Sequence, residues 1–152
     1  MPTELTLDQT KQFVRQHFED FVNKRNASII QRNMTPDFYD HNGPGNKPTD
    51  RNGDEKMMVE MYKAMPDLHV TIDDMIAEGD KVALRWTTRG TEHGSVQTPL
   101  GVTPATERAI DIPGINIFRI VNGKIAEEWI VWDTLSWAQQ LGLVSRAPQA
   151  TK

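Results

Sequence analysis

The feature that most constrains the fold of this chain is a change in the spacing of its hydrophobic residues near Pro66. Before this proline, apolar residues recur every three or four positions, the spacing of helices that bury one face. After it, apolar and polar residues alternate, which is typical of strands. The tetrapeptide VNGK, residues 121–124, adds an Asn-Gly turn, the strongest short signal for a β-hairpin. We therefore predict an α+β fold, with helices packed on a curved, mainly antiparallel sheet of about four to six strands.

Three helices are predicted before Pro66. The first begins at a capping box formed by Thr6 and Gln9, and its apolar stripe comprises Phe13, Val14, His17, Phe18, Phe21 and Val22. A short second helix covers residues 28–34, and a loop rich in Gly, Pro, Asn and Asp follows over residues 35–50. The third helix spans residues 53–65, and Asn52 with Glu55 can cap its start.

Four long strands are predicted after Pro66, over residues 68–77, 81–91, 108–120 and 125–133. In the second strand Val82, Leu84, Trp86 and Thr88 share one face. Arg85, Arg89 and Arg119 fall on the opposite face, where Glu128 is near enough to form ion pairs. A β-bulge is expected at Pro113-Gly114. A short C-terminal helix follows, which Gly142 can close.

Charge and composition narrow the class of function. The 152 residues carry a formal net charge of −4 and contain no basic run, so we expect neither a nucleic-acid partner nor a membrane surface. The chain has no cysteine, which removes disulfides and thiolate chemistry. It has no long apolar segment and no signal peptide, so a cytoplasmic protein is expected. Residues 1–152 are predicted to form one domain, with a core over about 10–143 and both ends frayed.

The segment EEWIVWDTLSW places one acid, Asp133, among three tryptophans. On a strand, Trp129 and Asp133 share a face, so a cavity that receives Trp129 would also receive the carboxylate. Burial there would raise its pKa into the range useful for proton transfer. Alternatively, Asp133 is the N-cap of the helix that follows, and spacing alone favours the cap.

Several segments resemble the SnoaL-like polyketide cyclase family, which belongs to the cone-shaped NTF2-like α+β superfamily. They are FYDHN, MPDLHVTIDDMIAEGDKVALRWTTRGTEHG, GVTPATER and GINIFRIVNGKIAEEWIVWDTLSWAQQLG. The resemblance covers roughly residues 10–143. It implies a pocket between the concave face of the sheet and the helices, and it reverses the preference at Asp133, which matches the acid/base position of the family. It also implies a role for His41 and a homodimer formed through the sheet face.

A substrate pocket would be lined by apolar and aromatic side chains. The candidate substrate-binding residues are His17, Met61, Trp86, Phe118 and Trp129. Each has an ordinary alternative as a core residue, above all the methionine stripe of the third helix. The four histidines show no ligand spacing, so no metal and no other cofactor is expected.

Three hypotheses follow for function. The first is a polyketide or ester cyclase-type enzyme that performs cofactor-free acid/base chemistry on a small hydrophobic carbonyl compound, with Asp133 as the acid/base and His41 as its assistant. The second is a module that binds such a molecule without turning it over. The third is an interaction domain whose cone is filled by side chains.

Overall fold

The structure is a computed structural model that describes residues 4–98 and 101–145. Its α-helices are Leu7–Phe18 (α1), Ile29–Asn33 (α2), Arg51–Ala64 (α3) and Thr134–Gln140 (α4). A π-helical turn, Glu19–Asn23 (η1), follows α1, and a 3-10 turn covers Pro44–Asn46 (η2). The predicted capping box of Thr6 and Gln9 is present at the start of α1. The cap of α3 is Asp50, whose side chain accepts a hydrogen bond from the Gly53 N–H, rather than Asn52.

The strands are Met34–Gly43 (β1), Lys47–Thr49 (β2), His69–Glu78 (β3), Lys81–Thr91 (β4), Val96–Thr98 (β5), Gly101–Thr103 (β6), Ala109–Val121 (β7) and Lys124–Trp132 (β8). Six of them form one sheet in the order β2-β1-β8-β7-β4-β3, and β5 pairs with β6 in a separate hairpin. The strands β1 and β8 run parallel, whereas every other pair is antiparallel. The predicted α+β class is confirmed.

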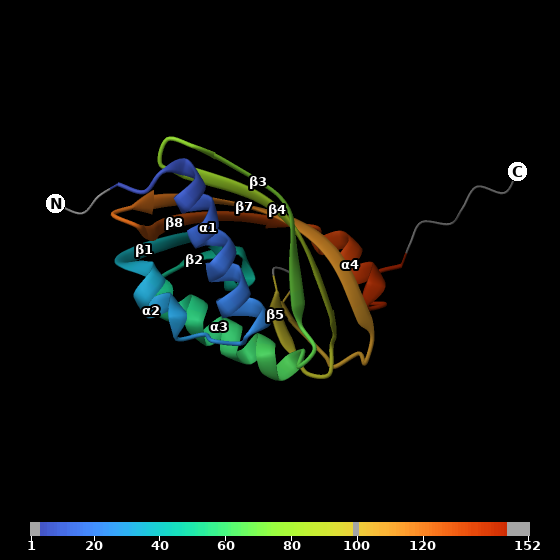
Figure 1. The fold of residues 1–152 in the computed structure, drawn as a ribbon. Coiled ribbons are helices and arrows are strands. Elements are labelled where there is room, and N and C mark those ends of the chain that lie inside the picture. The colour runs from blue at the N-terminus through green and yellow to red at the C-terminus, as the bar shows by residue number, and fades with distance from the viewer. Residues whose placement is uncertain (1–3, 99–100, 146–152) are drawn as a thin grey trace, which may run out of the picture.

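The helices α1, α2 and α3 lie on one side of the strongly curved sheet, and α4 lies at the opposite end of the molecule (Figure 1). Side chains from both layers form the core, including Val14 and Ile30 from the helices and Val82, Leu84 and Phe118 from the sheet. Burying each such side chain contributes about 1.5–3 kcal/mol, so the concave side of the sheet holds the helices in place. None of the described helices is both long and apolar enough to cross a membrane.

The segment 35–50 is not the loop that its composition predicts. It supplies most of β1 and all of β2, and β1 joins the middle of the sheet beside β8. Within β1, Phe38 and Asp40 are buried while Tyr39 is exposed, so the strand alternates in spite of its polar composition. Pairing with β8 overrides the weak strand propensity of this segment.

A β-bulge occurs in the hairpin of β7 and β8, but not at Pro113-Gly114. The pairing of β7 with β4 is continuous through these two residues. The register with β8 shifts instead between Arg119 and Ile120, where β8 carries one extra residue. In that region Ile125 and Ala126 are both buried, which breaks the alternation. Every residue of β8 beyond the bulge therefore lies on the face opposite to the one that unbroken pairing would give.

Gly114 serves a different purpose. It pairs with Trp86 across the two strands, and a Cβ atom at position 114 would lie 2.1 Å from the indole ring. Real Cβ atoms do not approach other atoms this closely. The glycine therefore leaves the space in which the Trp86 ring lies.

Candidate active site

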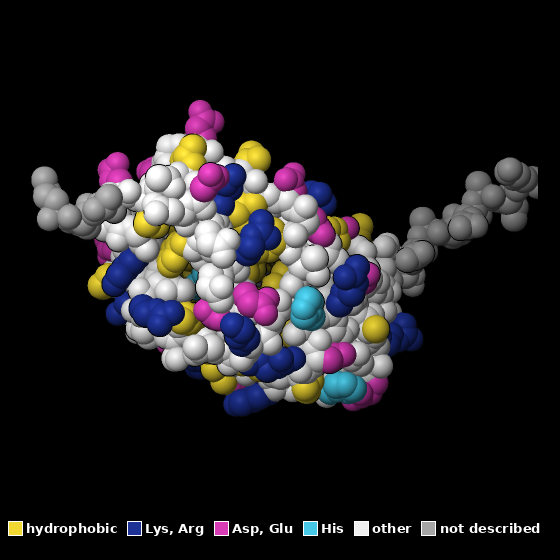
Figure 2. All heavy atoms as spheres, in the orientation of Figure 1, with side chains coloured by type: hydrophobic (Ala, Val, Ile, Leu, Met, Phe, Trp, Pro, Cys, Tyr) yellow, Lys and Arg dark blue, Asp and Glu magenta, His cyan; other side chains and the backbone are white. Residues whose placement is uncertain are grey.

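A cavity of about 650 Å³ lies between the concave face of the sheet and the helices. Much of its wall is apolar and comes from Met57, Met58, Met61 and Met65 of α3 and its C-terminal end, together with Trp86 and Phe118 of the sheet. No Lys or Arg belongs to the described residues that line it. Figure 2 shows the helical side of the molecule, where hydrophobic side chains are visible in the middle of a face with mixed charges. A volume of this size suits a small organic molecule.

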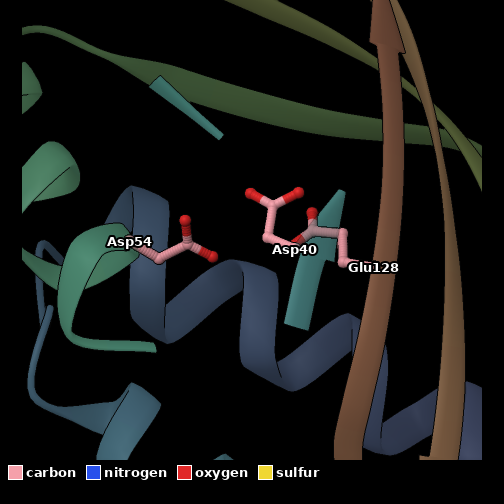
Figure 3. A group of neighbouring side chains, drawn as sticks. All are labelled: Asp40, Asp54 and Glu128. Carbon is pink, nitrogen blue, oxygen red and sulfur yellow. The ribbon is translucent and has the colours of Figure 1, made fainter. Parts of the chain in front are cut away.

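Three carboxylates meet at the wall of this cavity: Asp40, Asp54 and Glu128 (Figure 3). Asp40 of β1 and Glu128 of β8 are register partners in neighbouring parallel strands, so their side chains leave the sheet side by side on the concave face. Asp54 comes from the first turn of α3 and faces them from the helical layer. All three side chains are at least nine-tenths buried.

Few donors reach these carboxylates. The Asn42 N–H donates to Asp40 Oδ1 over 2.8 Å, and the Asn116 side-chain amide donates to Glu128 Oε1. The Oδ1 atom of Asp54 is buried without any hydrogen-bond partner. No cationic side chain of the described cavity wall offsets the charge, so protonation lowers the electrostatic energy of the cluster.

The pKa values follow from this environment. Burial, and then the nearby Asp40 charge, raise the pKa of Asp54 to about 9. Burial also raises the pKa of Asp40, although hydrogen bonds from Asn42 and Asp54 oppose the rise. Burial, and then the charges of Asp54 and Asp40, raise the pKa of Glu128 well above its ordinary value. Near neutral pH, Asp54 therefore carries a proton, which it donates to Asp40.

The same cluster has the spacing of a cation site. One oxygen from each carboxylate lies within 4.8 Å of the others, and hard divalent cations prefer such ligands. A group of acids is not by itself a metal site, and no histidine belongs to it. The expectation that this chain uses no metal stays a prediction.

His17 lies at another part of the cavity wall. Its ring stacks on Phe21 at 5.3 Å between centroids, and its Nδ1 atom lies 3.1 Å from the Asn33 side-chain nitrogen. Burial lowers the pKa of His17 to about 4, so the ring is neutral at pH 7. Because the Asn33 amide donates to Nδ1, the ring proton belongs on Nε2.

The structure brings together four of the five residues predicted to bind substrate, since His17, Met61, Trp86 and Phe118 all line the cavity. The expectation that Trp129 does so is wrong. Its ring lies on the outer face of the sheet.

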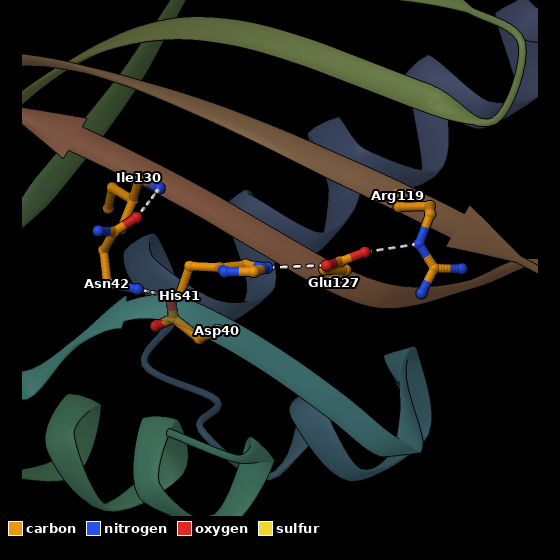
Figure 4. Close-up of polar contacts among 6 residues, drawn as sticks. All are labelled: Asp40, His41, Asn42, Arg119, Glu127 and Ile130. Carbon is orange, nitrogen blue, oxygen red and sulfur yellow. Dashed lines mark hydrogen bonds and ion pairs between the residues drawn. The ribbon is translucent and has the colours of Figure 1, made fainter. Parts of the chain in front are cut away.

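His41 also lies on this outer face, away from the cavity. Its ring stacks on the Trp129 indole, with 4.7 Å between centroids and an angle of 11° between planes. Its Nε2 atom lies 2.7 Å from Glu127, which in turn pairs with Arg119 (Figure 4). Glu128, predicted to lie on this face among the arginines, lies on the concave face instead, and Arg119 pairs with Glu127.

Asp133 does not open into the cavity either. It is exposed, and its Oδ1 atom accepts a hydrogen bond of 2.9 Å from the Ser136 N–H at the start of α4. This is the N-cap geometry that spacing alone favoured. The prediction that Trp129 and Asp133 share a side holds, but the premise that Trp129 faces the cavity is wrong, because the bulge in β8 inverts the strand beyond Ala126.

Sequence reasoning missed the whole carboxylate cluster. The composition of residues 35–50 predicts a loop, which hides the inward position of Asp40. Unbroken alternation along β8 predicts an outward Glu128, whereas the bulge turns it inward. Asp54 lies in a helix whose sequence predicts a methionine-rich apolar face, and nothing in that pattern indicates an acid facing the sheet. The one available signal was the alternation of Phe38 and Asp40 with Tyr39, which indicates a strand with an inward acid.

Comparisons with known proteins agree with this architecture. A family model described as SnoaL-like polyketide cyclase matches residues 12–141. The structure is similar to that of AclR, a putative hydroxylase from Streptomyces galilaeus, with 26% identity, a TM-score of 0.79, and coverage of 95% of this chain and 91% of AclR. It is also similar to IdmH, a putative polyketide cyclase from Streptomyces antibioticus, with 27% identity, a TM-score of 0.73, and coverage of 88% and 99%. These neighbours share the NTF2-like fold. A search of curated proteins returned no match.

Proposed function

Because the chain belongs to the SnoaL-like polyketide cyclase family, we propose that this cyclase-type enzyme catalyses cofactor-free proton transfer on a small hydrophobic carbonyl compound bound in the cavity. The observation that carries the proposal is the buried pair of Asp40 and Asp54 at the wall of an apolar cavity, where burial raises the pKa of both carboxyls. The proposed acid/base chemistry is the one expected from the sequence, but the residues that perform it are different.

Asp40 is the base in this scheme. Its charged form accepts hydrogen bonds from the Asn42 N–H and from protonated Asp54, and such bonds favour ionisation. Asp40 accepts the proton of a carbon next to a carbonyl group. The C–H bond breaks, an O–H bond forms on Asp40, and the electron pair moves onto the carbonyl oxygen as an enolate. Ring closure or protonation at carbon can follow from the enolate.

Asp54 is the proton reservoir beside this base. Its pKa of about 9 keeps it neutral near pH 7, so in this scheme it donates a hydrogen bond that favours the charged form of Asp40. The hydrophobic wall supports an apolar substrate, since the methionines of α3 can adapt to the shape of a flexible or planar molecule.

The test is proton exchange at carbon. Bicyclic and tricyclic β-ketoesters in D2O serve as probes, and NMR follows the loss of the signal of the proton between the two carbonyl groups. We expect the wild-type protein to accelerate the exchange. Asp40→Asn should lower the rate by about 10²-fold or more, because the base is lost. Asp54→Asn should have a smaller effect, since an amide can still donate to Asp40.

Asp133→Asn is the matched control, because it removes one carboxylate outside the cavity and leaves a side chain that can cap α4. It should leave the exchange rate unchanged. Binding of the probes without exchange would favour the alternative of a non-catalytic module. A metal-dependent site would reveal itself if exchange required an added divalent cation.

A further inference from the structure

Trp86, Asn116 and Glu128 form a buried chain of hydrogen bonds at the wall of the cavity. The Trp86 Nε1–H donates to Asn116 Oδ1 over 2.6 Å. The Asn116 Nδ2–H in turn donates to Glu128 Oε1. The three residues are exposed by only 8%, 2% and 9%. Solvent therefore does not compete for these bonds.

The chemistry of the indole fixes the direction of this chain. Indole N–H can only donate, so the group that faces it must be the carbonyl oxygen of Asn116. The NH2 group of Asn116 then points to Glu128. The indole itself is held in place because Gly114, its partner on β7, leaves room for the ring. The orientation of the amide is thus set by its neighbours.

The oxygens of Glu128 are made unequal by this arrangement. Oε1 accepts from Asn116, and the carbonyl oxygen of a neutral carboxyl is its better acceptor, so a proton on Glu128 is favoured on Oε2. Burial and the charges of Asp40 and Asp54 favour the neutral carboxyl over the carboxylate and raise the pKa of Glu128. Glu128 lines the cavity, so its hydroxyl is available to a bound molecule.

We propose that Trp86 and Asn116 are positioning residues that fix Glu128 as a hydrogen-bond donor to an oxygen atom of the bound molecule. This rests on the proposed function, in which the substrate carbonyl becomes an enolate oxygen. A neutral carboxyl held beside that oxygen stabilises the developing negative charge without becoming charged itself. Asp40 accepts the proton from carbon, and Glu128 stabilises the charge on the enolate oxygen by donating a hydrogen bond to it.

Binding of 2-naphthol tests this role without depending on turnover, because its oxygen resembles an enol or enolate oxygen on a planar ring. Glu128→Gln should bind within about threefold of the wild type, since the Gln carbonyl can accept from Asn116 while its NH2 donates to the ligand. Glu128→Leu keeps the bulk but has no donor, and we expect its affinity to fall by about 10-fold or more. Equal losses in Gln and Leu, or no loss in Leu, would overturn the proposal.

The dependence on pH provides a readout that a purely structural role would not move. The affinity of the wild type for 2-naphthol should fall as Glu128 loses its proton at high pH. Glu128→Gln has no such proton, so the decrease should be smaller in this variant; Asp54 and the hydroxyl of 2-naphthol titrate with both proteins and account for what remains. An unchanged pH profile in Glu128→Gln would contradict the role of donor.

Trp86→Phe tests the positioning step, since it keeps an aromatic ring and removes the N–H that orients Asn116. We expect about 10-fold weaker binding of 2-naphthol in the wild-type background and no further loss in the Glu128→Leu background. An equal loss in both backgrounds would show that Trp86 acts only as cavity wall. In 15N-labelled wild-type protein, which needs no substitution, the Trp86 indole and Asn116 amide protons should be protected from solvent exchange, and rapid exchange would contradict the chain.

Failure of this proposal is distinguishable from failure of the proposed function. If Asp40→Asn leaves proton exchange on the β-ketoesters intact, the acid/base scheme is wrong whatever Glu128 does. If Asp40→Asn abolishes exchange but substitutions at Glu128 leave the affinity for 2-naphthol unchanged, the acid/base scheme is supported and the role of Glu128 as a donor is wrong.

Discussion

At the scale of single residues, three acidic side chains are buried where charged residues are rarely found. Asp40, Asp54 and Glu128 are buried, and the described wall around them offers no Lys or Arg. Burying such groups lowers stability unless they are neutralised. Their presence therefore argues for a role in chemistry rather than in folding.

The first prediction concerns the dependence of stability on pH. The pKa of Asp54 is raised from 3.8 to about 9 in the folded protein, so the folded state binds more protons than the unfolded state between these values. Its contribution to stability is fully present below pH 4 and is lost as pH rises through 9. We expect Asp54→Asn to flatten the decrease in the free energy of unfolding between pH 6 and pH 9, by up to about 1.4 kcal/mol per pH unit.

Urea unfolding at several pH values provides the measurement. Asp133→Asn, which removes an exposed carboxylate, is the control and should keep the wild-type slope. If Asp54→Asn also keeps that slope, Asp54 is not protonated in the folded protein, and the proton reservoir beside Asp40 is lost from the scheme.

At the scale of elements, the sequence predicts the turns, caps and strands that depend on neighbouring residues. It does not predict the elements that depend on pairing between distant strands. The Asn-Gly turn, the long strand β4 and the capping box of α1 all follow from neighbouring residues, and the structure confirms them. The strand β1 exists because β8 pairs with it, and the inward face of β8 depends on one bulge. The only local signal for β1 is the alternation around Tyr39, and no local pattern indicates the bulge, so the cavity wall was predicted in part and the acids were not.

The second prediction concerns the cap of α4. Asp133→Ala removes the acceptor of the Ser136 N–H, and we expect a loss of about 1 kcal/mol in the free energy of unfolding. The helix end matters because Trp137 and Leu141 of this region belong to the core. Thermal unfolding measures the loss, and Asp133→Asn should restore most of it. A fall in proton exchange with Asp133→Asn, at unchanged melting temperature, would instead return the catalytic role to Asp133.

At the scale of the whole molecule, the sheet has two faces with different surroundings. The concave face holds the cavity and the helices. The opposite face carries a band of apolar side chains on β1, β7 and β8, formed by the exposed Tyr39, Ile115, Ile117 and Val131 and the half-buried Trp129. Charged pairs such as Arg119 with Glu127 lie beside it. Exposed apolar surface of this kind is a frequent site of protein association.

The third prediction is that two copies of the chain associate through this outer band, as a homodimer. Val131 is the most exposed of its members, at 72%, so Val131→Lys places a charge in the contact with little effect on the core. We expect the wild type to elute as a dimer and Val131→Lys as a monomer in size-exclusion chromatography with light scattering. Ile76→Lys, at an exposed position outside the band, is the control and should remain dimeric. A monomeric wild type would contradict the prediction.

The extra residue in β8 shifts the register of this hairpin by one position. Beyond it the two faces of the strand are exchanged, so Glu128 lies at the cavity while its neighbour Glu127 lies on the outer face and pairs with Arg119. A related chain could gain or lose one codon there, keep every strand and helix, and present a different set of groups to its substrate. Aligning such chains by tryptophans alone would then transfer chemical roles to the wrong side of the sheet.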